Sequence, residues 1–153
     1  MSSKFLLVRE VLAEVARTGR PEITRRAEVE AAFGSVDAFL LALHHRWRTA
    51  VFARLDALLE NGPADSPADF DAAVAAAWTD PATGGRGLRA LLDAHADTPE
   101  LAEAQERERR LVRSTVGVDV PAPGTRPRTG TRPRTVRNAG ACPLTRLWWR
   151  GAA

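Results

Sequence analysis

The sequence predicts an all-α fold, a compact bundle of about six helices organised on one long central helix. Apolar residues recur at spacings of three and four along most of the first 113 residues, and helix start and stop signals divide that region into segments. The pattern is lost after Arg113, where prolines and glycines become frequent. The chain of 153 residues is long enough for one domain with a single core.

The longest amphipathic run extends from Phe33 to Glu60 and predicts the central helix. Ser35 is placed to cap the start of this helix, and the sequence Asn61-Gly62-Pro63 ends it. Its apolar residues keep a three-to-four spacing: Val36, Leu40, Leu43, Trp47, Val51, Leu55 and Leu58. Additional apolar positions widen this face, so we expect several other helices to pack against it.

Two helices are predicted before the central one. The first covers Ser3 to Arg17 and is stopped by a glycine and a proline shortly afterwards. The second is short, and we expect Thr24 to be its N-cap, because a threonine hydroxyl there can accept an unpaired backbone N–H. It ends at Phe33, since Gly34 can adopt positive φ.

Three more helices are predicted after the central one. Ser66 and Pro67 open a helix that reaches about Thr79. A glycine-rich connector leads to a short helix from Leu88 to about His95. The last helix begins at Pro99 and ends near Arg113, with acids at its start and arginines at its end that complement the helix dipole.

Charge divides the chain into an acidic body and a basic tail. Up to Val120 there are 15 basic and 19 acidic residues, a net charge of −4, whereas the remainder carries seven arginines and no acid, a net charge of +7. We expect residues 1–116 to form the helical domain and residues 117–153 to be a disordered Arg/Pro-rich tail. The tail arginines are candidates for nonspecific binding of DNA or another polyanion: Arg126, Arg128, Arg132, Arg134 and Arg137.

The sequence indicates a cytoplasmic protein. Its single cysteine, Cys142, allows no internal disulfide. Charged residues interrupt the apolar N-terminal stretch too soon for a signal peptide or a membrane span, so no membrane association is expected.

No motif predicts catalysis, a cofactor or a metal. The adjacent His44 and His45 point about 100° apart on a helix, whereas a metal pair needs one face. Asp93, His95 and Asp97 alternate, but at a helix end and not on a strand. We therefore interpret these residues as ordinary positions and expect a protein that is not an enzyme.

Seven large apolar residues are candidates for a ligand pocket or for the core, two roles that the sequence alone leaves open. A pocket would take a small apolar ligand. The seven are Leu40, Leu43, Trp47, Val51, Trp78, Leu88 and Leu91.

The stretch AAFGSVDAFLLALHHRW, residues 31–47, resembles the junction in TetR-type transcriptional regulators between the DNA-reading helix and the long connecting helix. FLLVREVLAEVARTG, residues 5–19, resembles the first helix of that family. Residues 87–92 and 97–104 look like helices of its ligand-binding domain. Together these stretches cover most of residues 5–113.

This resemblance implies a regulatory protein with a DNA-binding-like part at 3–34 and a ligand- or interaction-like part at 35–113. It would place Arg25 and Arg26 against DNA. Three departures from the family pattern matter. Glu28 and Glu30 place two acids where the family usually has neutral residues that contact phosphate. Only nine steps separate Thr24 from Phe33, which is too short for a complete helix-turn-helix, and no C-terminal dimerisation helices follow Arg113. The alternative is a helical protein–protein interaction module without DNA reading, which pairs with itself or with a helical partner.

Overall fold

The computed structural model describes residues 3–61 and 66–122. Within these ranges the chain forms six α-helices and no strand, which confirms the predicted fold class. None of the described helices is long and apolar enough to cross a membrane. In chain order the helices are α1 (Ser3–Thr18), α2 (Arg26–Phe33), α3 (Val36–Asn61), α4 (Pro67–Thr79), α5 (Leu88–Ala94) and α6 (Pro99–Val116).

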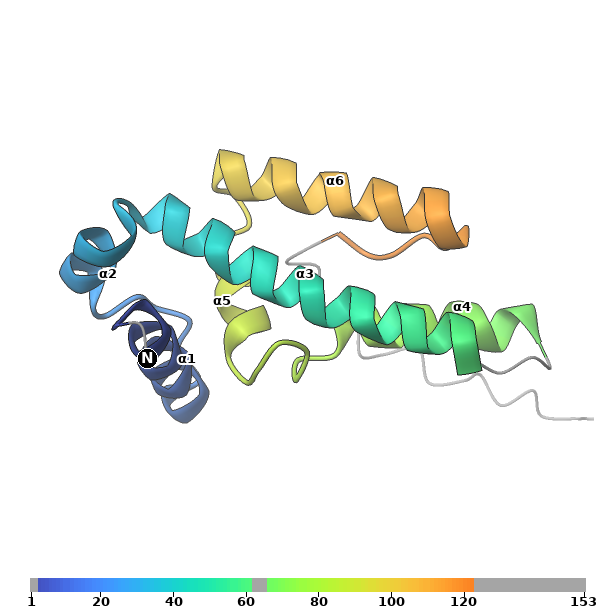
Figure 1. Cartoon of the computed structure of the whole chain (residues 1–153), viewed down its shortest axis with the longest axis horizontal. Coiled ribbons are helices and arrows are strands. Elements are labelled where there is room, and N and C mark those ends of the chain that lie inside the picture. The colour runs from blue at the N-terminus through green and yellow to red at the C-terminus, as the bar shows by residue number, and fades with distance from the viewer. Residues whose placement is uncertain (1–2, 62–65, 123–153) are drawn as a thin grey trace, which may run out of the picture.

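The 26-residue helix α3 is the centre of the fold, as predicted. It contacts α2, α4, α5 and α6, while α1 contacts α2 and α5 (Figure 1). The backbone N–H of Ala38 donates to Ser35 Oγ at 3.0 Å, so the serine caps the helix as its sequence position predicts. With α1 and α2 at its start and α4 beside its end, α3 joins the two halves of the molecule (Figure 1).

One hydrophobic core runs along α3 and includes residues from all six helices. Trp47 on α3 and Trp78 on α4 are its largest members, and both are fully buried. Their burial follows from the three-to-four spacing, which directs one face of each amphipathic helix towards its neighbours.

The predicted capping role of Thr24 is wrong. Helix α2 begins at Arg26, and its N-cap position is occupied by Arg25, which makes no side-chain capping bond. The Thr24 hydroxyl instead donates to Glu14 Oε2 on α1 at 2.6 Å. The Thr24 hydroxyl therefore bonds to a residue of α1 and does not provide the cap of α2 that the local sequence predicted.

The predicted start of the tail at residue 117 is also wrong. Gly117 ends α6 in the left-handed conformation, and residues 117–122, here called the strap, turn back between α6 and α3 (Figure 1). Val118 and Val120 of the strap are buried in the core. The Trp78 Nε1–H donates to the carbonyl oxygen of Pro121 at 3.2 Å. The folded part therefore extends at least to residue 122.

Candidate functional site

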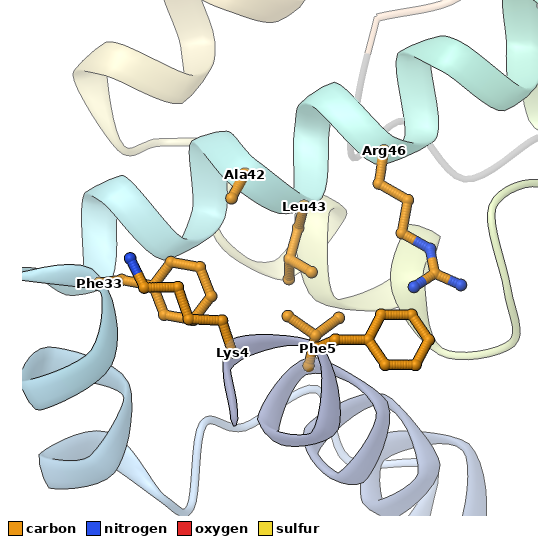
Figure 2. A pocket seen from close by; sticks show the side chains of 7 residues that line it. Lys4, Phe5, Phe33, Ala42, Leu43 and Arg46 are labelled. Carbon is orange, nitrogen blue, oxygen red and sulfur yellow. The ribbon is translucent and has the colours of Figure 1, made fainter. Parts of the chain in front are cut away.

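An apolar groove lies between α1 and α3 and is the candidate binding surface. Figure 2 shows side chains of both helices converging on it from opposite sides. Its volume is about 220 Å³, and it is open to solvent along one side. We call it the α1–α3 groove, and its lining residues are Lys4, Phe5, Val8, Phe33, Ala42, Leu43 and Arg46.

The groove exists because α1 is held to the rest of the fold through α2 and α5. At the α5 contact, Gly87 has a φ of +81°, and a Cβ there would lie 2.8 Å from the carbonyl oxygen of Leu12 on α1. This close approach fixes the last turns of α1 against α5. The first turns of α1 supply Lys4, Phe5 and Val8 to the groove wall, and Phe5 is 47% exposed there.

A cation stands at each end of the groove (Figure 2). The Lys4 ammonium lies 5.3 Å from the centre of the Phe33 ring, a cation–π contact. Arg46 Nε donates to the carbonyl oxygen of Gly84 at 2.9 Å. Neither side chain forms an ion pair with a residue in the described ranges, so the groove combines an apolar floor with uncompensated positive charge.

The two arginines predicted to contact DNA are already engaged by carboxylates. Arg25 forms ion pairs with Glu28 on α2 and with Glu10 on α1, and these hydrogen bonds raise its pKa above the ordinary value. The bond from Arg25 in turn lowers the pKa of Glu28. Arg26 Nε lies 2.8 Å from Glu30 Oε1. Helix α2 therefore presents acids beside both of its candidate phosphate contacts.

The seven pocket-or-core candidates all lie in the core, each with at most 1% of its surface exposed. Only Leu43 also reaches the α1–α3 groove. Trp47 illustrates how the interior is filled, since Trp78 covers one side of it and the Arg89 guanidinium lies 5.2 Å from its ring centre. The groove residues on α1 were missed, because the spacing of apolar residues along a helix does not say how closely a neighbouring helix approaches.

Polar side chains are buried where α6 meets α3. Arg48 Nε lies 2.9 Å from Glu108 Oε1, and the Glu108 side chain is only 8% exposed. His44, one turn before Arg48, is 4% exposed, and its Nε2 has no hydrogen-bond partner within the described part of the chain. Burial, with the nearby cations Arg48 and Arg89, lowers the pKa of His44 to about 4. His44 is therefore neutral at pH 7.

No group of three or more His, Cys, Asp or Glu side chains within residues 3–61 and 66–122 could hold a metal ion. His45, the neighbour of His44, is exposed on α3. The predicted polyanion-binding arginines from Arg126 to Arg137 lie outside the described residues, as do Trp148 and Trp149.

Comparison of the chain with protein-family models, curated proteins and solved structures gives no match. The likeness to TetR-type regulators therefore rests on the residue pattern of the chain alone. Function has to be argued from the groove, the charges and the arrangement of the helices.

Proposed function

We propose that this chain is a helical protein–protein interaction module that receives apolar side chains of a partner helix in the α1–α3 groove. The observation that carries the proposal is the combination of an open apolar groove with Lys4 and Arg46 at its two ends. An amphipathic helix can place its apolar face in an apolar groove of this kind. The two cations favour a partner with acidic residues beside that face.

An open groove supports a macromolecular partner better than a small apolar ligand. Ligand pockets typically enclose about 70–90% of the ligand surface, whereas this groove is open along one side. The predicted pocket candidates pack against one another in the core, as Trp47 and Trp78 do. Binding at the surface of α1 and α3 requires no rearrangement of these residues.

The proposal is tested by fluorescence anisotropy with a labelled acidic amphipathic helical peptide that carries leucines on one face and glutamates beside them. We expect the unchanged chain to bind the peptide and Phe5→Asp to bind it at least about tenfold more weakly. The matched control is Leu111→Asp, which changes a 38% exposed leucine on α6, outside the groove, and should leave the affinity unchanged. Equal affinity of the Phe5 variant and the unchanged chain would overturn the proposal.

The second candidate is a TetR-type regulator, with Arg25 and Arg26 at DNA. The observation that favours it is the position of α3, which joins α1 and α2 at one end to α4 along the other (Figure 1). Carboxylates at both arginines weigh against it, because α2 then offers DNA little net positive charge. We therefore rank it below the interaction module.

Duplex DNA at low salt tests this second candidate. If Arg25 contacts phosphate, Glu10→Gln with Glu28→Gln should raise the affinity several-fold, because it frees the guanidinium from both carboxylates. Glu103→Gln with Glu106→Gln removes the same charge on α6 and is the control. If the chain has no affinity for DNA, or only an affinity that vanishes in a chain ending at residue 122, the regulator candidate fails.

The basic C-terminal sequence provides a separate contribution, nonspecific binding of polyanions. If all seven arginines after Asp119 engage duplex DNA, log affinity should fall against log salt with a slope of about −6. Ending the chain at residue 122 should remove this slope, and an unchanged slope would contradict the assignment.

A further inference from the structure

The last turns of α3 present an acidic and apolar surface that complements the α1–α3 groove. Leu59 and Glu60 lie three and four positions after Asp56, so each of them is a surface neighbour of Asp56 on the helix. All three are exposed, and Leu59 is 56% exposed, a large fraction for a leucine in a folded protein. We call these three residues the α3 end face. An exposed leucine with two carboxylates beside it complements an apolar groove that Lys4 and Arg46 line.

The charges of the end face are available for a partner. Neither Asp56 nor Glu60 forms an ion pair or a hydrogen bond with a side chain of the described ranges, whereas the nearby Arg54 is paired with Asp80. At the groove, Lys4 and Arg46 likewise have no carboxylate partner in those ranges. Both surfaces therefore keep a net charge, and the two charges have opposite signs.

One molecule cannot join its own two surfaces. The end face lies about ten residues further along α3 than Arg46, a separation of roughly 15 Å at about 1.5 Å per residue. A rigid helix holds this distance, and α1 lies at the opposite end of α3 from residues 56–60 (Figure 1). Contact between the surfaces therefore requires two molecules.

We propose that the α1–α3 groove takes the α3 end face of a second copy of this chain, with Leu59 seated between Phe5 and Val8 and with Asp56 and Glu60 at Lys4 and Arg46. This inference rests on the proposed interaction module and names its partner. The contact is heterologous, because two different surfaces of the same chain meet, so an associated pair keeps one free groove and one free end face. Association proceeds head to tail.

The basic end of the same chain is a poorer occupant. Every residue after Asp119 that carries charge is an arginine, so this segment would bring like charge to Lys4 and Arg46. The contact between copies is small, with one leucine as its anchor and two exposed charge pairs at its rim. It is therefore weak, with a dissociation constant in the range of about 10 μM to 1 mM, and it is sensitive to salt.

Sedimentation velocity of the full chain with paired charge reversals tests the proposal. The groove variant is Lys4→Glu with Arg46→Glu, and the end-face variant is Asp56→Lys with Glu60→Lys. All four residues are exposed, and an acid at position 4 suits the first turn of α1, so both variants should fold, as far-UV circular dichroism would verify. The control Arg20→Glu with Arg86→Glu reverses two exposed cations outside the groove.

The mean mass of the unchanged chain and of the control should rise with concentration, and added salt should reverse the rise. Each charge-reversed variant alone should remain monomeric, with association weakened at least about tenfold. An equimolar mixture of the two variants should associate again, because every contact in the mixture pairs opposite charges. Recovery on mixing is not expected from a variant that has merely failed to fold.

Two results would overturn the proposal: an unchanged chain that stays monomeric, or a mixture of variants that does not associate although the unchanged chain does. If the unchanged chain is monomeric but still binds the acidic helical peptide through Phe5, the interaction module stands and only the second copy is wrong. If neither peptide binding nor association depends on the groove, both proposals fall.

Discussion

Trp47 and Trp78 meet edge to face, with ring centres 4.7 Å apart and ring planes at 80°. This contact joins the middle of α3 to the end of α4, and the indole N–H of Trp78 continues it to the strap through the Pro121 carbonyl. Edge-to-face pairs stabilise beyond the area that they bury, because the positive edge of one ring faces the negative face of the other. Three segments far apart in sequence thus meet at one side chain.

Trp78→Phe should keep most of this packing and lose the hydrogen bond to Pro121. We expect it to lower the free energy of unfolding by about 1–2 kcal/mol, and Trp78→Ala, which also leaves a cavity, by about 3–5 kcal/mol. Urea unfolding followed by far-UV circular dichroism measures both values. Equal losses in the two variants would contradict the assigned role of the ring.

The strap should stabilise the fold. A chain ending at residue 122 should unfold at the same urea concentration as the full chain, because it retains every described contact. A chain ending at residue 116 loses the burial of Val118 and Val120, which we expect to lower the free energy of unfolding by about 2–4 kcal/mol. Identical unfolding of the two truncated chains would show that the strap contributes nothing.

Gly87 should tolerate no larger side chain. A methyl group there would have to adopt a φ of +81° and would lie 3.2 Å from the Val15 Cβ on α1 as well as against the Leu12 carbonyl. Gly87→Ala is therefore expected to cost about 2–4 kcal/mol in unfolding free energy. Gly19 has a similar φ of +68°, but a Cβ there would meet no atom within 4 Å. Gly19→Ala therefore measures the cost of the backbone conformation alone, which should be about 1 kcal/mol in unfolding free energy. Equal losses of unfolding free energy in Gly87→Ala and Gly19→Ala would contradict the tight α1–α5 contact.

His44 should make stability depend on pH. Its pKa in the folded state is about 4, below the ordinary value of 6.5, so the unfolded chain binds the proton first as the pH falls. Stability is complete above about pH 6.5 and decreases towards pH 4, by up to roughly 3 kcal/mol. His44→Gln removes this titration, so the difference in unfolding free energy between the variant and the unchanged chain should shift by that amount between pH 7 and pH 4. If the difference in unfolding free energy between the two proteins does not change with pH, the low pKa of His44 in the folded state is wrong.

The fold was predictable to a large extent because each helix carries its own signals. Spacing of three and four placed five residues of α3 in the core correctly, although Val36 and Leu58 are only partly buried, and Ser35 marked the start of the helix. Thr24 was misassigned because its partner, Glu14, is ten residues away on another helix. The strap was missed because its two buried valines form no helical period, so no spacing in the sequence marks them as buried.

The candidate site was much less predictable than the fold. Sequence patterns placed Leu43 on an apolar face but could not tell a filled interface from an open one, since that depends on the angle between α1 and α3. They also placed Arg25 and Arg26 near the second helix without revealing that Glu10 reaches Arg25 from α1. The net charge of a site depends on side chains from several helices. The spacing of residues along one helix therefore does not predict it.

The ion pair between Arg48 and Glu108 determines where α6 can lie along α3. Sliding α6 by one helical turn would move Glu108 about 5.4 Å along the interface and leave its buried carboxylate without the guanidinium. An uncompensated buried charge costs about 3–5 kcal/mol, so the displaced arrangements are sparsely populated. Leu101 and Val112 are buried on the same helix and give it apolar contacts. The polar pair thus adds a preference for the observed register of α6 against α3.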